Sequence, residues 1–284
     1  MANHYSKCFN VEYELYSKIS KIHRKDSVDE KLKLLRDVLI KSYFDSGIGI
    51  DECKSLSATI ITMFKEELDG NYIHIFFKDA FLKSILSEME IRDFEGIKKY
   101  ISENGSSVLF HEFENFSEIT SYNFCIHIPN EQYGFAIQIG LNDKMELRGL
   151  IINNGYTIPC SEWDITSVLK KKDLDDQDKA ILLGINTIAY IGCFPECLID
   201  GIPKGIRLEN GFKNKKITLT TSEKVVVFDK TGRSVIPHFR RGFFRYYADE
   251  RYTKMKGKIQ FIEATVVNSK NAKTLLSTSK KVKD

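Results

Sequence analysis

The sequence predicts an α+β protein with a helical N-terminal part, a central antiparallel sheet meander and a small basic β-rich module at the C-terminus. Three observations predict this class. Apolar residues recur at helical spacing early in the chain, alternation takes over after Gly105, and basic and aromatic residues gather near the end. We therefore expect a helical region at 1–105, a mixed sheet and helix core at 106–200, and a basic module at 201–284.

Helical spacing is clearest from Asp29 to Phe44, where Leu32, Leu35 and Leu39 fall on one face. A second helix is expected over ECKSLSATIITMFKEEL, which Gly70 closes. Two shorter helical patterns follow, KDAFLKSILSEME and FEGIKKYISEN. This predicts that the first 100 residues are helical.

Three short runs after Gly105 are rich in Ile, Phe and Tyr: SYNFCIHIP, QYGFAIQIGL and MELRGLIINN. The turn-like segments NEQ and NDK separate them, which predicts an antiparallel meander. Ser161 is then a candidate N-cap for SEWDITSVLKK. The acids of DLDDQDK are expected to stabilise the N-terminus of a core helix that carries Ile181, Ile185 and Ile188.

The segment from Pro195 to Lys216 is rich in Gly and Pro and is expected to be a long irregular connection. Strands are expected again in ITLTT, EKVVVFD, the stretch around SVIPHFRRGFF, and KIQFIEATVV. The polar, basic tail after residue 267 is expected to fray or extend.

Composition places the protein among soluble globular chains, with 42% hydrophobic and 29% charged residues. No stretch is apolar enough to cross a bilayer, and the start MANHYSKCFN lacks a secretory signal, so we expect a cytoplasmic protein with no membrane partner. The six cysteines are expected to be mostly buried thiols. Cys193 and Cys197 offer two metal ligands, but no second pair lies nearby at zinc spacing, so no metal or cofactor is assigned.

Charge is distributed unevenly. From Arg233 to Asp284 there are thirteen Lys or Arg and four Asp or Glu, a formal charge of +9, whereas the whole chain carries +3. Residues 1–232 therefore carry −6. Such a distribution bears on partners and association and says little about the fold.

The stretch SVIPHFRRGFFRYYADERYTKMKGK, residues 234–258, interleaves cations with aromatic rings. Guanidinium groups match phosphate oxygens, and rings stack on bases, so the pattern suits RNA or a ribonucleoprotein. The residues expected to contact nucleic acid are Arg240, Arg241, Arg245, Arg251, Lys254, Phe244 and Tyr247. A second interpretation remains open, in which Arg240 and Arg241 pair with carboxylates of the acidic remainder, because an unpaired buried guanidinium costs several kcal/mol.

Enzyme motifs are weak in this chain. It has no Walker loop, no GxSxG and no HExxH, and GIGID at 47–51 lacks the strand-turn-helix setting of a dinucleotide site. These absences argue against an ATPase, a hydrolase and a Rossmann enzyme. His238 lies inside the basic cluster, where neighbouring arginines favour the neutral ring, so it is the candidate general base if the module is a ribonuclease. A structural histidine bonded to a backbone carbonyl is the other interpretation.

The segment PHFRRGFFR, residues 237–245, followed by KGKIQFIEATVV, resembles the C-terminal module of a broad family of phage and mobile-element proteins with the pattern P-H-x-R-R-G-H-W-R. That family includes an anti-CRISPR protein of the type V-A class, which acts on the message of the nuclease during translation. Phe243 and Phe244 replace the family's His and Trp, and the loss of the second histidine removes one partner of an acid and base pair. The resemblance therefore implies binding more than catalysis.

Together these observations predict a phage or mobile-element accessory protein, with anti-CRISPR or other anti-defence activity, that binds RNA, a ribonucleoprotein or a translation-associated target. The acidic N-terminal part is expected to recognise a protein target. Two alternatives stay open: a ribonuclease that uses the basic module, and a structural or protein-interaction domain whose arginines are paired internally.

Overall fold

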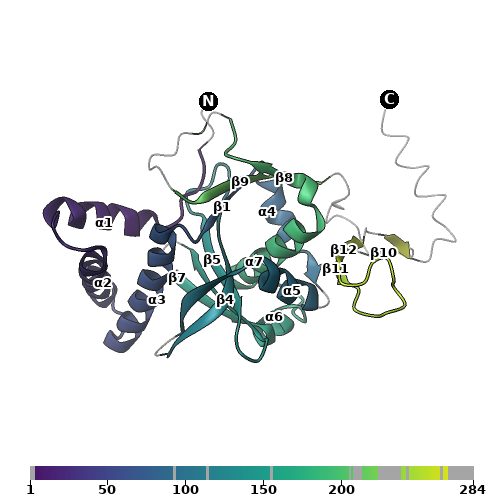
Figure 1. The fold of residues 1–284 in the computed structure, drawn as a ribbon, viewed down its shortest axis with the longest axis horizontal. Coiled ribbons are helices and arrows are strands. Elements are labelled where there is room, and N and C mark those ends of the chain that lie inside the picture. Colours follow the sequence, from purple (N-terminus) through teal and green to yellow (C-terminus); the bar gives the residue numbers. More distant parts are fainter. Residues whose placement is uncertain are drawn as a thin grey trace.

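A mixed β-sheet lies at the centre of the α+β fold (Figure 1). The computed structural model describes residues 4–91, 94–112, 115–153, 156–204, 206, 213–222, 238–240, 243–262 and 265–267. The strands of the sheet are β1 (Ile73–Phe77), β3 (Ser106–Glu112), β4 (Asn115–His127), β5 (Phe135–Leu141), β6 (Leu147–Asn153), β7 (Tyr156–Ser161), β8 (Leu198–Asp200) and β9 (Lys215–Leu219). Their order is β7-β6-β5-β4-β1-β9-β8, and β3 pairs with β4.

The predicted meander is confirmed, because β4, β5 and β6 pair antiparallel in sequence order. Strand β1 corrects the expectation of a wholly helical N-terminal region. It lies between β4 and β9 and is parallel to both, so the sheet is mixed. The sheet draws strands from all three expected regions.

The described helices are α1 (Asn10–Ile22), α2 (Val28–Asp45), α3 (Ile50–Asp69), α4 (Phe81–Leu86), α5 (Glu95–Asn104), α6 (Glu162–Val168), α7 (Asp176–Cys193) and the short 3₁₀ helix η1 (Pro195–Cys197). Gly70 ends α3 with a φ of 91°, which suits glycine because it has no Cβ. Ser161 and Asp175 cap α6 and α7, each in a capping box with the acid three residues later. Both expected helix starts are confirmed.

Helices cover the two faces of the sheet and create two apolar cores. On one face, α7 packs Ile181, Ile185 and Ile188 against the sheet, together with α4, α5 and α6. On the other face, α1, α2 and α3 bury residues such as Leu35 and Phe64. Side chains alternate along β1 and β4, so every second residue faces each core.

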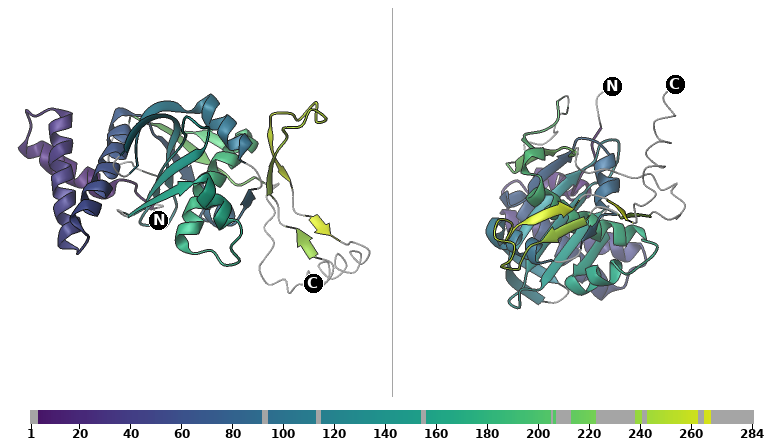
Figure 2. Two further views of the ribbon diagram at one scale, coloured as in Figure 1. Left: turned by 90° about the horizontal axis from the view of Figure 1, so that it is seen from below. Right: turned by 90° about the vertical axis from the view of Figure 1, so that its right-hand side faces the viewer.

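A hairpin projects from the end of the molecule opposite α1–α3 (Figure 2). Its strands β11 (Phe243–Tyr246) and β12 (Ile259–Ile262) are antiparallel, and β11 also pairs with β2 (Glu90–Ile91). Nearby, β10 (His238–Arg240) pairs with β13 (Thr265–Val267). The expected strand EKVVVFD lies outside the described residues.

No helix in the described ranges is both long and apolar enough to span a bilayer. All six cysteines are free thiols, and five are buried, as expected.

Candidate functional site

Polar side chains gather beneath α3, on the face of the sheet that α1–α3 cover. Parallel pairing of β1 with β4 places His74 beside Cys125 and Phe76 beside His127. Glu67 reaches this place from the last turns of α3, and Asn214 from the residue before β9. Each of these residues is at least nine-tenths buried, and Glu67 is only 1% exposed.

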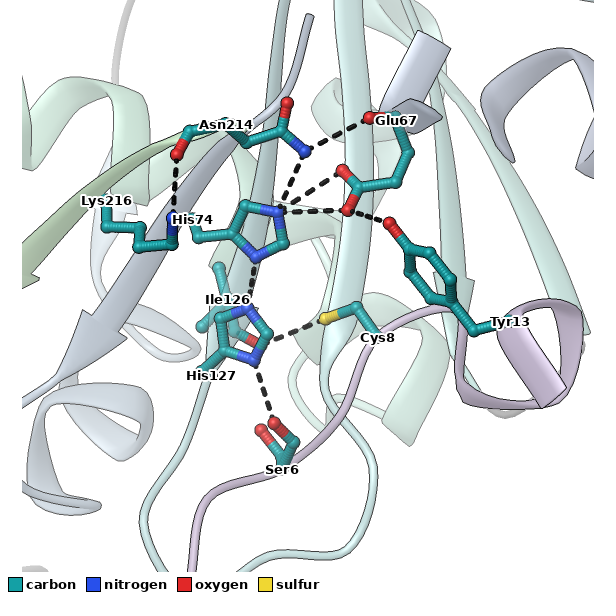
Figure 3. A network of polar contacts seen from close by, with 9 residues as sticks. All are labelled: Ser6, Cys8, Tyr13, Glu67, His74, Ile126, His127, Asn214 and Lys216. Carbon is teal, nitrogen blue, oxygen red and sulfur yellow. Dashed lines mark hydrogen bonds and ion pairs between the residues drawn. The ribbon is translucent and has the colours of Figure 1, made fainter. Parts of the chain in front are cut away.

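The side chains form one continuous hydrogen-bonded chain (Figure 3). His127 Nδ1 lies 2.8 Å from the Ser6 carbonyl oxygen, and His127 Nε2 lies 2.8 Å from His74 Nδ1. His74 Nε2 then lies 3.1 Å and 3.3 Å from the two carboxylate oxygens of Glu67. Tyr13 completes the chain by donating its hydroxyl to Glu67 Oε1 at 2.8 Å.

The proton positions follow from what each partner can do. A carbonyl only accepts, so His127 carries its proton on Nδ1. Burial, and repulsion from His74, lower the pKa of His127 to about 3, so its ring is neutral and Nε2 is an acceptor. His74 must therefore donate from Nδ1 to His127. The other ring nitrogen of His74 is left facing the Glu67 carboxylate.

Thiol and phenol groups surround this hydrogen-bonded network. Burial raises the pKa of the Cys125 thiol well above its usual range, and a hydrogen bond with Cys8 adds to the shift. Cys8 also donates to the Ile126 carbonyl oxygen at 3.5 Å. Tyr72 is 1% exposed, and its hydroxyl has no hydrogen-bond partner among the described residues. Burial likewise raises the pKa of Tyr72 far above its usual range.

Sequence reasoning missed this buried cluster. His127 belongs to no local ligand motif such as HExxH, and His74 lies in a strand that was not predicted. One signal was present: a histidine stands inside each of two apolar runs, IHIFF and NFCIHIP. Their meeting depends on the pairing of strands that are far apart in the chain, which local spacing does not reveal.

The basic hairpin holds several residues that the sequence singled out. Arg245 is exposed, with its guanidinium 5.1 Å from the centre of the Tyr247 ring and 5.6 Å from that of Tyr252. Arg251 lies 4.8 Å from the Tyr252 ring centre and forms an ion pair of 3.3 Å with Asp249. Lys254 is exposed on the turn between the strands. The structure therefore brings the predicted residues of this segment together on one hairpin.

Phe244 is a correction to the predicted set. Its ring is 1% exposed and packs edge-on against Phe261 at a centroid distance of 5.6 Å. Phe243 is buried as well, so β11 does not alternate between a buried and an exposed face at this point. The Phe244 ring belongs to the core and offers no stacking face to a base.

The remaining candidates lie outside what the structure describes. His238 and Arg240 belong to β10, but only their backbone is described, and Arg241 falls outside the described residues. For the CxxxC pair, burial raises the pKa of Cys193 to about 12, with a contribution from Glu196. Where the chain is described, neither Cys193 nor Cys197 belongs to a cluster of three potential metal ligands.

Comparison with family models, with curated proteins and with solved structures gives no match for this chain. The resemblance at residues 237–245 therefore remains a prediction from the sequence.

Proposed function

We propose that this protein binds RNA or a ribonucleoprotein through the hairpin β11–β12. The observation that carries the proposal is the exposed surface formed by Arg245, Tyr247, Arg251, Tyr252 and Lys254, which we call the hairpin surface. Two guanidinium groups lie over tyrosine rings there, which holds planar cations and flat rings in one place. A nucleotide presents the complementary pair, a phosphate and a base.

The acids of the hairpin neutralise only part of its charge. Asp249 pairs with Arg251, and Glu250 pairs with Lys256 at 2.8 Å. These pairs are half-exposed or more, so they contribute little to stability, and a phosphate can compete for their cations. Arg245 and Lys254 have no ion pair with any residue that the structure describes.

Single-stranded RNA fits the hairpin surface better than a simple polyanion does. Lysines alone would attract any anion, whereas tyrosine faces add stacking worth about 1–3 kcal/mol per base. Tyr247 and Tyr252 are half-buried and pack edge-on at a centroid distance of 4.7 Å, so the rings are held in place before binding. Little conformational entropy is then lost when a base stacks.

The biological setting rests on the PHFRRGFFR resemblance. On that basis we propose a phage or mobile-element accessory protein with anti-defence activity, directed at an RNA or a translation-associated complex. The helices α1–α3 lie at the end of the molecule opposite the hairpin (Figure 2). They are the proposed place for a protein target, so RNA and protein would be bound at separate surfaces.

The direct test is binding of labelled single-stranded RNA, followed by fluorescence anisotropy at several salt concentrations. The double variant R245A/K254A should weaken binding and reduce the slope of log affinity on log salt by about one unit for each lost phosphate contact. The matched control is K33A/K41A, which removes two exposed lysines of α2 far from the hairpin. It should leave both affinity and slope unchanged.

Equal effects of the two double variants, or a flat salt response of the unmodified protein, would refute the hairpin surface as an RNA site. The same RNA also tests the ribonuclease alternative. Cleavage that is lost in His238→Ala would replace the binding proposal with an enzymatic one. Intact RNA in both samples supports binding without cleavage.

A further inference from the structure

A second site lies in the buried cluster beneath α3. We propose that Glu67, His74 and Cys125 bind a single divalent transition-metal ion of the zinc class. A carboxylate oxygen, an imidazole nitrogen and a sulfur from these residues all lie within 4.8 Å of one another. They come from α3, β1 and β4, so the site joins a helix to the two central strands of the sheet.

The spacing between His74 and Glu67 suits a shared cation. His74 Nδ1 lies 2.8 Å from His127 Nε2, which leaves His74 Nε2 directed at the Glu67 carboxylate. Tetrahedral zinc bonds of normal length place nitrogen and oxygen ligands about 3.3 Å apart. His74 Nε2 lies 3.1 Å and 3.3 Å from the Glu67 oxygens, which matches that spacing.

Outer hydrogen bonds already orient the proposed ligands. Metal-bound histidines usually donate their second N–H to a fixed acceptor, which sets the tautomer and the ring orientation. His127 is that acceptor, and its own Nδ1–H is held by the Ser6 carbonyl oxygen. Glu67 is held in turn by the hydroxyl of Tyr13. This relay leaves the Nε2 atom of His74 directed at the carboxylate.

Two buried polar atoms beside the cluster lack partners among the described residues: Asn214 Oδ1 and Tyr72 Oη. Asn214 is 4% exposed, and its amide nitrogen lies 3.3 Å from His74 Nε2. Unsatisfied buried groups are rare in proteins, so their presence here points to a missing partner.

Charge balance also favours a divalent ion. A buried carboxylate and a buried thiolate are each costly without a compensating charge, and Glu67 and Cys125 are both buried, at 1% and 0% exposed. One divalent ion with a carboxylate, a thiolate and a neutral imidazole has no net charge. A mixed sulfur, nitrogen and oxygen set suits zinc, whereas calcium and magnesium prefer oxygen ligands alone.

Cobalt(II) is the probe for this site, because a thiolate ligand gives it a charge-transfer absorption band that reports the sulfur directly. The full chain, purified under reducing conditions without a chelator or a His tag, should bind Co²⁺ in a one-to-one ratio and show that band. Cys125→Ser should abolish the band. Glu67→Gln, which keeps the shape of the side chain but loses its charge, should weaken Co²⁺ affinity at least tenfold.

Cys53→Ser is the matched control, since Cys53 is as fully buried as Cys125 but lies outside the cluster. It should keep both the band and the affinity. Absence of the band in the unmodified protein would overturn the proposal, because His74 and Glu67 would then be joined by a proton and not by a metal ion. A band that survives in Cys125→Ser or disappears in Cys53→Ser would overturn it too. If Glu67→Gln left the Co²⁺ affinity unchanged, the Glu67 carboxylate would not be a ligand of the ion.

Discussion

Polar side chains buried inside this protein need hydrogen-bond partners, whereas the apolar side chains around them need only be packed. Glu67, His74 and His127 are removed from water, so each must find a hydrogen-bond partner or lose about 1–3 kcal/mol. The chain from the Ser6 carbonyl oxygen to the Tyr13 hydroxyl provides those partners. The N-terminal segment is therefore held over the sheet by a side chain of β4, not by apolar packing alone.

A second buried carboxyl group, that of Glu12, makes stability depend on pH. Glu12 is 3% exposed, and burial raises its pKa above the usual value. Its folded-state pKa exceeds its unfolded value, so its stabilising contribution is full below the unfolded pKa and is lost as pH rises through the folded pKa. Glu12→Gln should therefore raise the free energy of unfolding at pH 7 by on the order of 1 kcal/mol.

Urea denaturation at pH 4 and at pH 7 measures this effect. The gain from Glu12→Gln should shrink towards pH 4, where the carboxyl group of the unmodified protein is already protonated. Glu14→Gln is the control, because Glu14 lies on the same helix but is exposed. A gain of equal size at both pH values would show that ionisation of Glu12 is not its cause.

At this scale the sequence predicted the surface better than the interior. Arg245, Tyr247 and Arg251 could be singled out because cations and rings alternate within one short segment. Phe244 was assigned to the same surface, and the structure places it in the core. The buried cluster was not predicted, because His74 and His127 meet only through the pairing of β1 with β4.

Secondary-structure elements follow local rules wherever a local signal exists. Ser161 caps α6 as expected, and α7 begins within the acidic segment that was expected to stabilise its N-terminus. Alternation predicted the meander of β4, β5 and β6. Strand β1 carries no such signal. Both faces of β1 are buried, so its sequence IHIFF does not show a regular change between apolar and exposed polar residues. It is also too short to distinguish from a piece of buried helix.

Alanine substitutions at two helical glycines are expected to change the stability of the protein in opposite directions. A Cβ at Gly96 of α5 would overlap the side chain of Ile259 in β12. A Cβ at Gly184 of α7 would have its nearest neighbour at 3.4 Å, an ordinary contact. Gly96→Ala should therefore destabilise the protein by about 1–3 kcal/mol, because it pushes the hairpin away from α5. Gly184→Ala should stabilise it by up to about 1 kcal/mol.

Chemical denaturation of both variants checks this pair of predictions. Helix propensity alone would stabilise both variants. An increase in the free energy of unfolding for both would therefore show that β12 does not pack against α5 at Gly96. Hydrogen exchange adds a local measure, because Gly96→Ala should speed exchange in β11 and β12 more than in β5.

The whole molecule places two different surfaces at its opposite ends, with the sheet between them (Figure 1). Helices α1–α3 lie at one end, and the hairpin surface lies at the other, beyond α5 and α7. The described hairpin, residues 243–262, holds five Lys or Arg and two acids and so carries a formal charge of +3 at that end. An anion that approaches the molecule is therefore expected to meet the hairpin end first.

The most direct measurement of the proposed function is hydrogen exchange of the full chain with and without single-stranded RNA. The proposal predicts slower exchange in residues 243–262 when RNA is bound, with no change in α1–α3. Protection confined to α1–α3, or no protection anywhere at an RNA concentration that saturates binding, would contradict it.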